Sequence, residues 1–323
     1  MQAMSNKGFR KFLIVLSVFI VISIIFYFIS PNLSLPFYKG SFKDYIAVLY
    51  IQDTISEAES NAFTSSRYNH NYILNQINAF MNDDKNKALV IFVDSPGGGI
   101  YETDELYLKL MEYKEKKEAP IYVSMGSIAA SGGYYISAAG NKIYINRNTI
   151  TGSIGVTMGT FYDVSGFLEK HGIKTVTMTA GRNKAMGDIT TPMTQEQKDI
   201  IQSLLNESYE QFVDIIVQGR GIAKETVRNI ADGRLYSAKQ AVDLNLVDEI
   251  GTLDDAIQGI RNDYGLNDCE VYYYWYEDKS FLSSLLNGFS NISQKYSQGD
   301  IGMVLQLLEK NEQVPISYLL KLN

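Results

Sequence analysis

Short apolar runs alternate with stretches of helical spacing along most of this chain. The runs have the length of buried strands, which predicts strands at residues 46–51, 89–93, 121–124, 142–145, 153–156 and 174–178. Between them, apolar residues recur every three or four positions. This spacing predicts helices at residues 72–81, 106–118, 194–218, 237–244 and 254–260. Strands that alternate with helices predict right-handed βαβ units and a mainly parallel sheet, so the expected fold class is α/β.

The amino-terminal region departs from this pattern. Residues 12–29 are an apolar run without a charge or a proline. As a helix this run would be about 27 Å long, close to the hydrocarbon thickness of a bilayer. Basic residues precede it, so residues 1–11 are predicted to stay in the cytoplasm and the rest of the chain to lie outside the membrane. Bulky residues after the run favour an uncleaved signal-anchor over a cleaved signal, with residues 30–43 as a stalk.

The rest of the chain divides into a main domain, residues 44–268, and a carboxyl-terminal extension, residues 269–323, that begins with a strand-like aromatic run. A hydrophobic content of 46% and a charged content of 20% are typical of a packed globular protein. The net charge of −7 argues against a nucleic-acid partner. A single cysteine excludes an intrachain disulfide, and no Cys/His spacing predicts a metal site, so no cofactor is expected.

The candidate catalytic residues lie around Ser131. This serine is flanked by small residues and lies between a predicted strand and a predicted helix. A serine hydroxyl is a poor nucleophile unless a base takes its proton. Glycines at 97–99 and at Gly132 allow close backbone approach and can direct N–H groups at a developing oxyanion. Together these features predict an acyl-transfer site.

The base is harder to choose from the residues alone. The chain has two histidines, and both His70 and His171 are expected to cap a helix or lie on the surface. Lys184, on a glycine-bounded loop, is the better candidate. Lysines act as bases only where burial favours their neutral form, and a solvated loop lysine is the commoner case. Spacing therefore leaves the base open.

The chain resembles the signal peptide peptidase A family of serine–lysine peptidases over about residues 44–261. The resemblance rests on four motifs in order: Asp94-Ser-Pro-Gly-Gly-Gly99, Ala129-Ala-Ser-Gly-Gly-Tyr-Tyr135, Thr151-Gly-Ser-Ile-Gly-Val156 and Gly181-Arg-Asn-Lys184. It implies a crotonase/Clp-like stack of βαβ units and a serine endopeptidase. It assigns Ser131 as nucleophile, Lys184 as general base, Ser153 as the residue that orients the lysine, and Gly98 and Gly132 as the oxyanion hole.

The same resemblance implies partners and a location. Family members form ring- or dome-shaped homo-oligomers, in which the serine and lysine of one site can come from neighbouring protomers. Their substrates are signal peptides left in the membrane and cut within their apolar cores. Expected partners are therefore such peptides and, through residues 12–29, the lipid bilayer, with the catalytic domain outside the cell membrane. Gly97, Gly99 and Tyr134 are expected to contact substrate.

Two other functions stay open. An acyl-CoA hydratase or isomerase shares the fold, but these enzymes work in the cytoplasm, which an export anchor argues against. A non-catalytic membrane scaffold would keep the fold without peptidase activity. A separate hypothesis concerns the apolar carboxyl terminus: residues 315–323 resemble a substrate and are predicted to occupy the substrate groove and restrain activity.

Overall fold

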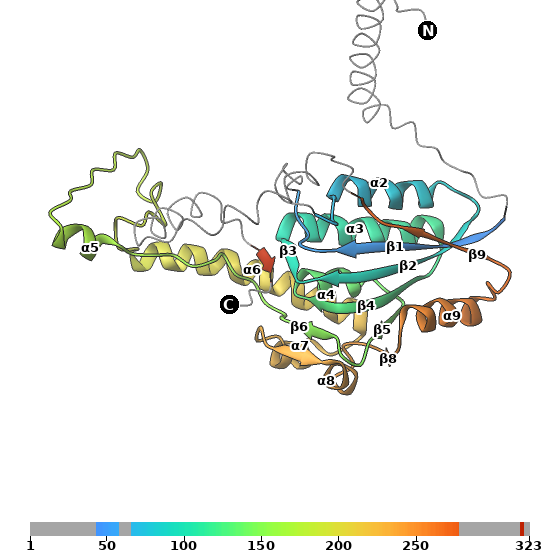
Figure 1. Ribbon diagram of the computed structural model, residues 1–323. Coiled ribbons are helices and arrows are strands. Elements are labelled where there is room, and N and C mark those ends of the chain that lie inside the picture. Colours follow the sequence, from blue (N-terminus) through green and yellow to red (C-terminus); the bar gives the residue numbers. More distant parts are fainter. Residues whose placement is uncertain (1–42, 58–65, 278–316, 320–323) are drawn as a thin grey trace, which may run out of the picture. The chain divides into compact units, whose positions relative to one another are not determined.

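A computed structural model describes residues 43–57, 66–277 and 317–319 of the chain (Figure 1). The predicted cytoplasmic segment and signal-anchor, residues 1–29, lie outside the described residues, and so does the stalk apart from its last residue. Among the helices that are described, none combines the length and apolar character needed to cross a membrane.

One sheet organises the described part of the chain. Its main strand order is β7-β6-β4-β2-β1-β9, with β5 beside β4 and β8 beside β5. All of its pairs are parallel except β6 with β7. The strands are β1 (Tyr45–Gln52), β2 (Asn86–Ser95), β4 (Ile121–Ala130), β5 (Lys142–Ile145), β6 (Ile150–Gly152), β7 (Leu235–Ser237), β8 (Glu249–Ile250) and β9 (Glu270–Tyr274). The predicted α/β fold with a mainly parallel sheet is confirmed.

Helices cover both faces of this sheet (Figure 1). The larger core lies between the sheet and α2 (His70–Met81), α3 (Ile100–Lys117), α4 (Gly132–Ser137) and the carboxyl-terminal half of α6 (Gln195–Arg220). A smaller core on the other face packs α9 (Leu253–Tyr264) against the first halves of the strands. The short helices α7 (Lys224–Ile230) and α8 (Ala238–Asp243) complete the larger core. Alternating residues of β1 and β2 supply the two cores, as the period of two in a strand requires.

The long helix α6 starts as its sequence predicts. The Thr194 side chain accepts a hydrogen bond from the Gln197 amide at 3.2 Å, and the Gln197 side chain accepts one from the Thr194 amide at 3.0 Å. This capping box satisfies two of the amides that a helix start leaves unpaired. The amino-terminal half of α6 is mostly exposed, whereas Phe212, Val213 and Ile216 are fully buried.

An exposed arm, residues 157–193, joins the sheet to α6. It contains the short helix α5 (Ser165–Lys170), which Figure 1 shows beside the amino-terminal end of α6. Several of its large apolar side chains are exposed, Val176 at 84% and Met178 at 91%. The arm therefore contributes little to the core of the chain.

Two predicted strands are wrong. No strand forms at residues 153–156. The nearest strand, β6, ends at Gly152, because Ser153 has a φ of +51° that breaks extended backbone. Residues 174–178 lie in the arm without a strand partner among the described residues, so their β-favouring composition has nothing to pair with. The strands predicted in the centre of the sheet are confirmed, but β4 continues six residues beyond the predicted 121–124, to Ala130.

Candidate active site

Ser131 lies at the turn between β4 and α4 and has an unusual backbone. Its φ is +54° and its ψ is −119°, a conformation that costs an L-residue free energy. The Ser131 amide donates to the Gly152 carbonyl at 2.8 Å, and the Ser131 carbonyl accepts from the Tyr135 amide at 2.9 Å. These bonds hold the strained turn in place. A strained serine between a strand and a helix is an arrangement that presents a nucleophilic hydroxyl.

A cavity of about 430 Å³ opens beside this serine. Ser131 and Ser153 both line it, so the structure brings together two of the predicted catalytic residues. Within the described residues neither hydroxyl makes a side-chain hydrogen bond, which leaves both available to a substrate or a base. The Ser153 amide is fixed by donating to the Arg234 carbonyl at 2.8 Å. The remaining lining residues are Gly155, Val156, Thr157, Tyr209, Ala231, Asp232 and Gly233.

The glycine strand β3 (Gly97–Gly99) directs one of its amides away from the segment at Ile55. The Ile55 amide donates to the Gly97 carbonyl at 2.9 Å, and the Gly99 amide donates to the Ile55 carbonyl at 2.9 Å. Successive residues of a strand point their N–H groups to opposite sides, so the Gly98 N–H points away from Ile55. A Cβ on Gly98 would lie 1.7 Å from the Ile55 carbonyl oxygen, so only glycine fits there.

Gly132, the second predicted oxyanion donor, lies against this strand. A Cβ on Gly132 would be 3.1 Å from the Gly98 nitrogen and 2.7 Å from the Thr103 hydroxyl oxygen. As the first residue of α4, Gly132 has an amide without an intrahelical acceptor. The backbone nitrogens of Gly98 and Gly132 thus belong to neighbouring segments, as two donors to one oxyanion must. The roles themselves remain predictions from the family resemblance.

A strand from the carboxyl terminus lies on the free side of β3. β10 (Ser317–Leu319) pairs antiparallel with β3, and Tyr318 is opposite Gly98. These three residues belong to the segment 315–323 that the sequence hypothesis places in the substrate groove. The other residues of that segment are not described. An extended chain can therefore dock by strand addition where the Gly98 amide is directed.

Lys184 is not brought to Ser131 within one chain. Lys184 is exposed, and none of the described residues that line the serine cavity is a lysine. Its neighbour Arg182 pairs with Glu196 in the first turn of α6 at 2.5 Å. Tyr209, which does line the cavity, follows Glu196 by 13 residues, about 20 Å along a helix. The arm therefore holds the predicted base near the far end of α6.

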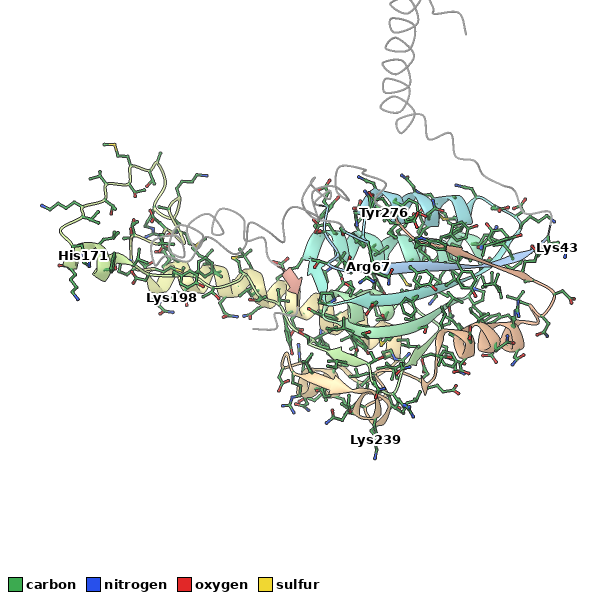
Figure 2. The ribbon with its side chains drawn as sticks, in the orientation of Figure 1. Lys43, Arg67, His171, Lys198, Lys239 and Tyr276 are labelled. Carbon is green, nitrogen blue, oxygen red and sulfur yellow. The ribbon has the colours of Figure 1, made fainter. Side chains whose placement is uncertain are left out.

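The described lining of the serine cavity contains no other candidate base. Its one ionisable carboxylate, Asp232, is paired with Arg234, and this hydrogen bond lowers the pKa of Asp232 to about 2. His171 caps α5, as predicted, and Figure 2 shows it at the end of the arm. His70 is buried rather than on the surface, where its ring nitrogens contact the Tyr68 hydroxyl at 2.6 Å and Glu105 at 2.8 Å.

The three residues predicted to contact substrate, Gly97, Gly99 and Tyr134, are absent from the described lining of the serine cavity. Tyr134 is fully buried and its hydroxyl donates to the Leu246 carbonyl at 2.8 Å, so it belongs to the core and not to a substrate surface. The Gly97 amide is occupied by the Ser95 hydroxyl at 3.2 Å, and the Gly99 amide by Ile55. These glycines shape the strand and leave the Gly98 amide to face β10.

Sequence reasoning missed residues that pack around the site. Thr103 on α3 is fully buried beneath Gly132, and its hydroxyl has no hydrogen-bond partner among the described residues. Tyr209 and Asp232 line the serine cavity from elements far along the chain. None of these positions has a motif of its own, and only the tertiary fold brings them to Ser131.

Comparison with known proteins agrees with this geometry. Residues 60–153 match the Clp protease family model, and residues 113–267 match the model of peptidase family S49. "Putative signal peptide peptidase SppA" of Enterococcus faecium is 36% identical over 249 residues, which cover 77% of this chain and 72% of that protein. "Protease 4" of Haemophilus influenzae is 32% identical over 75% of this chain and 39% of its own length. "Serine protease SPPA, chloroplastic" of Arabidopsis thaliana is 30% identical over 67% of this chain and 32% of its own length.

A strained serine beside a glycine strand, on a Clp-type α/β domain, defines a serine protease. The chain belongs to peptidase family S49, the signal peptide peptidase A family.

Proposed function

We propose that this serine protease is a membrane-anchored endopeptidase that uses Ser131 and Lys184 to degrade remnant signal peptides and other apolar peptides at the outer face of the membrane. The observation that carries the chemistry is the strained Ser131 beside Gly98 and Gly132. Ser131 attacks the peptide carbonyl, and the two glycine amides stabilise the oxyanion that forms. Lys184 takes the serine proton and later gives it to the leaving amine, and Ser153 orients the lysine.

The base reaches the serine from a neighbouring copy of the chain. Lys184 is exposed on an arm that also exposes Phe167 at 61% and Ile173 at 51%. Exposed apolar side chains at this density are typical of a protein–protein contact. An arm that docks beside the serine cavity of the next copy would bury these side chains and enclose the lysine, and enclosure favours the neutral form a base needs. Repeating this head-to-tail contact closes a ring- or dome-shaped homo-oligomer.

Peptides bind as an added strand on β3. The placement of Ser317–Leu319 supports this mode, because those residues occupy the side of β3 to which the Gly98 amide points. The same placement supports a regulatory role for residues 315–323, which would have to leave before a substrate binds. The apolar run at residues 12–29 would hold the domain at the membrane surface where signal peptides remain after secretion.

The sharing of one site between copies can be tested by mixing two inactive variants. In full-length protein in detergent, Ser131→Ala and Lys184→Ala should each lower cleavage of a fluorogenic signal-peptide core by about 10⁴-fold or more. A ring assembled from an equal mixture should regain activity at roughly a quarter of its sites, because an intact serine then meets an intact lysine by chance.

The outcomes separate the parts of the proposal. A mixture that stays inactive would show that Lys184 serves its own chain or no site at all. Activity that survives Lys184→Ala would refute the lysine as the base. An assembled parent protein that cleaves no peptide would favour the membrane-scaffold alternative.

A further inference from the structure

The described elements cover only half of the face of the sheet that carries α9. Ala256, Ile257 and Ile260 of α9 pack on residues from the first halves of the strands, among them Ile46 and Val90. Figure 1 shows α9 near the end of the sheet where β1 and β2 begin. No described helix packs in the same way on the carboxyl-terminal half of this face. That half lies on the strand ends that lead to the active site.

A row of aromatic side chains crosses the uncovered half. Tyr50 of β1 is opposite Phe92 of β2, with ring centroids 5.0 Å apart. On its other side Tyr50 contacts Trp275 edge-on, with centroids 6.5 Å apart. Trp275 is 50% exposed and Tyr273 is 46% exposed. These four residues, the aromatic row, form a partly exposed apolar surface, and no described helix packs on it.

A cavity of about 370 Å³ ends the row at Phe92. Asp94 is the only charged residue in its lining, and within the described residues it makes no ion pair. One Asp94 oxygen, Oδ1, accepts the Ile128 amide at 3.2 Å, which leaves Oδ2 open. Ser124 is 1% exposed and lines the cavity, and its side chain makes no hydrogen bond to another described residue. The other lining residues are Met125, Gly126, Ser127, Asn146, Asn148, Thr149, Thr252 and Leu253.

The surroundings of this cavity favour a positive ligand. The nearby cation Arg67 is bound to Asp53 at 2.7 Å, and it reaches Asp94 by electrostatic attraction only, without an ion pair among the described residues. A carboxylate with an open oxygen binds ammonium and guanidinium groups well, and aromatic faces attract the same cations.

We propose that the aromatic row and the Asp94 cavity bind a lysine or arginine side chain in the basic flank of a peptide substrate. This proposal rests on the proposed function, because it adds a basic flank to the apolar peptides that Ser131 would cut. The distance is suitable: Ser127 lines the cavity and precedes Ser131 by four residues, about 13 Å of extended chain. One peptide can therefore place its apolar core at Ser131 and its basic flank, at least about four residues away, at Asp94.

The test compares two fluorogenic peptides that share one apolar core and differ in a lysine-rich or a glutamine-rich flank. Asp94→Asn in the full-length protein removes the charge but keeps an oxygen for the Ile128 amide. Losing one charge-assisted hydrogen bond should lower the ratio of kcat/KM for the basic peptide to kcat/KM for the neutral peptide about tenfold. Asp243→Asn, at an exposed position on α8, changes the net charge equally and should leave the ratio unchanged. Trp275→Ala should lower the ratio in the same direction as Asp94→Asn.

An unchanged ratio in Asp94→Asn would overturn the proposal, whatever happened to either rate alone. Equal losses for both peptides would show that Asp94 only supports the neighbouring glycine strand. Binding of the same two peptides to the Ser131→Ala protein, followed by fluorescence anisotropy, separates this site from the proposed activity. Preference for the basic flank without cleavage by the parent protein would retain the binding site and refute the peptidase function.

Discussion

The predicted catalytic serines and the predicted catalytic lysine differ in how firmly a single chain holds them. Ser131 and Ser153 stand at the edge of the sheet, each with a positive φ and an amide held by a backbone hydrogen bond of 2.8 Å. Lys184 stands on the arm, exposed, with its amide bonded only three residues back, to Gly181 at 3.1 Å. The serine half is therefore preorganised by one chain, whereas the lysine half needs a contact that one chain lacks.

Packing explains why the serine half is rigid. Directly behind Ser131, the fully buried Tyr135 contacts Phe212 of α6, with ring centroids 5.0 Å apart. The Tyr135 hydroxyl donates to Asp104 of α3 at 2.6 Å, so α3, α4 and α6 are tied together at one residue. Packing of this kind can hold a strained residue in place, because several independent contacts fix the same backbone conformation.

The sharpest test of this contrast replaces one phenylalanine in each region. Phe212→Ala removes a fully buried side chain and should destabilise the folded chain by about 4 kcal/mol. Phe167→Ala on the arm, where the ring is 61% exposed, should change the stability of the monomer by less than about 0.5 kcal/mol. Chemical unfolding of both variants at low protein concentration gives the two values.

The arm variant has a second expected result. If the arm contacts another copy, Phe167→Ala should weaken self-association in sedimentation experiments while the fold of each chain is kept. A Phe167→Ala protein that unfolds as readily as Phe212→Ala would show that the arm belongs to the core of its own chain, and the contrast between the two regions would fail.

Gly132→Ala tests the preorganised half at its tightest point. The added Cβ would meet the Thr103 hydroxyl at 2.7 Å and the Gly98 nitrogen at 3.1 Å, so the two oxyanion donors should move apart. Loss of one donor to an oxyanion typically costs about 10² to 10³-fold in kcat. Steady-state kinetics should show this loss in kcat with a smaller change in KM.

Gly166→Ala on α5 is the matched control, because a Cβ there meets nothing within 4 Å. It should keep the parent fold and add a little helix stability, which shows whether an added methyl group alone disturbs the chain. A Gly132→Ala enzyme with the kcat of the parent protein would remove Gly132 from the oxyanion hole.

The core of the fold could be predicted because its signal is local. Each central strand is a continuous apolar run, and the Thr194–Gln197 capping box marks the start of α6 within the sequence itself. The strand predicted at residues 174–178 has the same local signal and is wrong, because a strand also requires a neighbour. The exposure of Val176 at 84% shows that none is available in the described part of this chain.

The candidate site also has a part that local sequence predicts and a part that it does not. Ser131 and Gly132 follow directly on β4, and Gly98 comes three residues after β2 ends; the ends of neighbouring parallel strands meet at one edge of the sheet. Their convergence could be anticipated from the order of the elements. Lys184 is separated from them by an arm whose position depends on contacts of α6, such as Arg182 with Glu196. No pattern near Lys184 encodes those contacts, and only the family resemblance singled it out.

The smallest expected effect is a difference in stability between two Ser131 variants, which reports the backbone strain at this residue. Its φ and ψ are those of the first central residue of a type II′ turn, a position that favours glycine. Ser131→Gly and Ser131→Ala both remove the hydroxyl and should both be inactive, but only alanine keeps the steric penalty. The glycine variant should therefore be more stable than the alanine variant by about 1 kcal/mol in urea unfolding, a net of relieved strain and lost chain entropy. Equal stability would mean that the turn holds no strain. A more stable glycine variant would show that the turn at Ser131 lowers the stability of the folded chain while it presents the hydroxyl. The exposed arm around Lys184 has no strain of this kind to relieve.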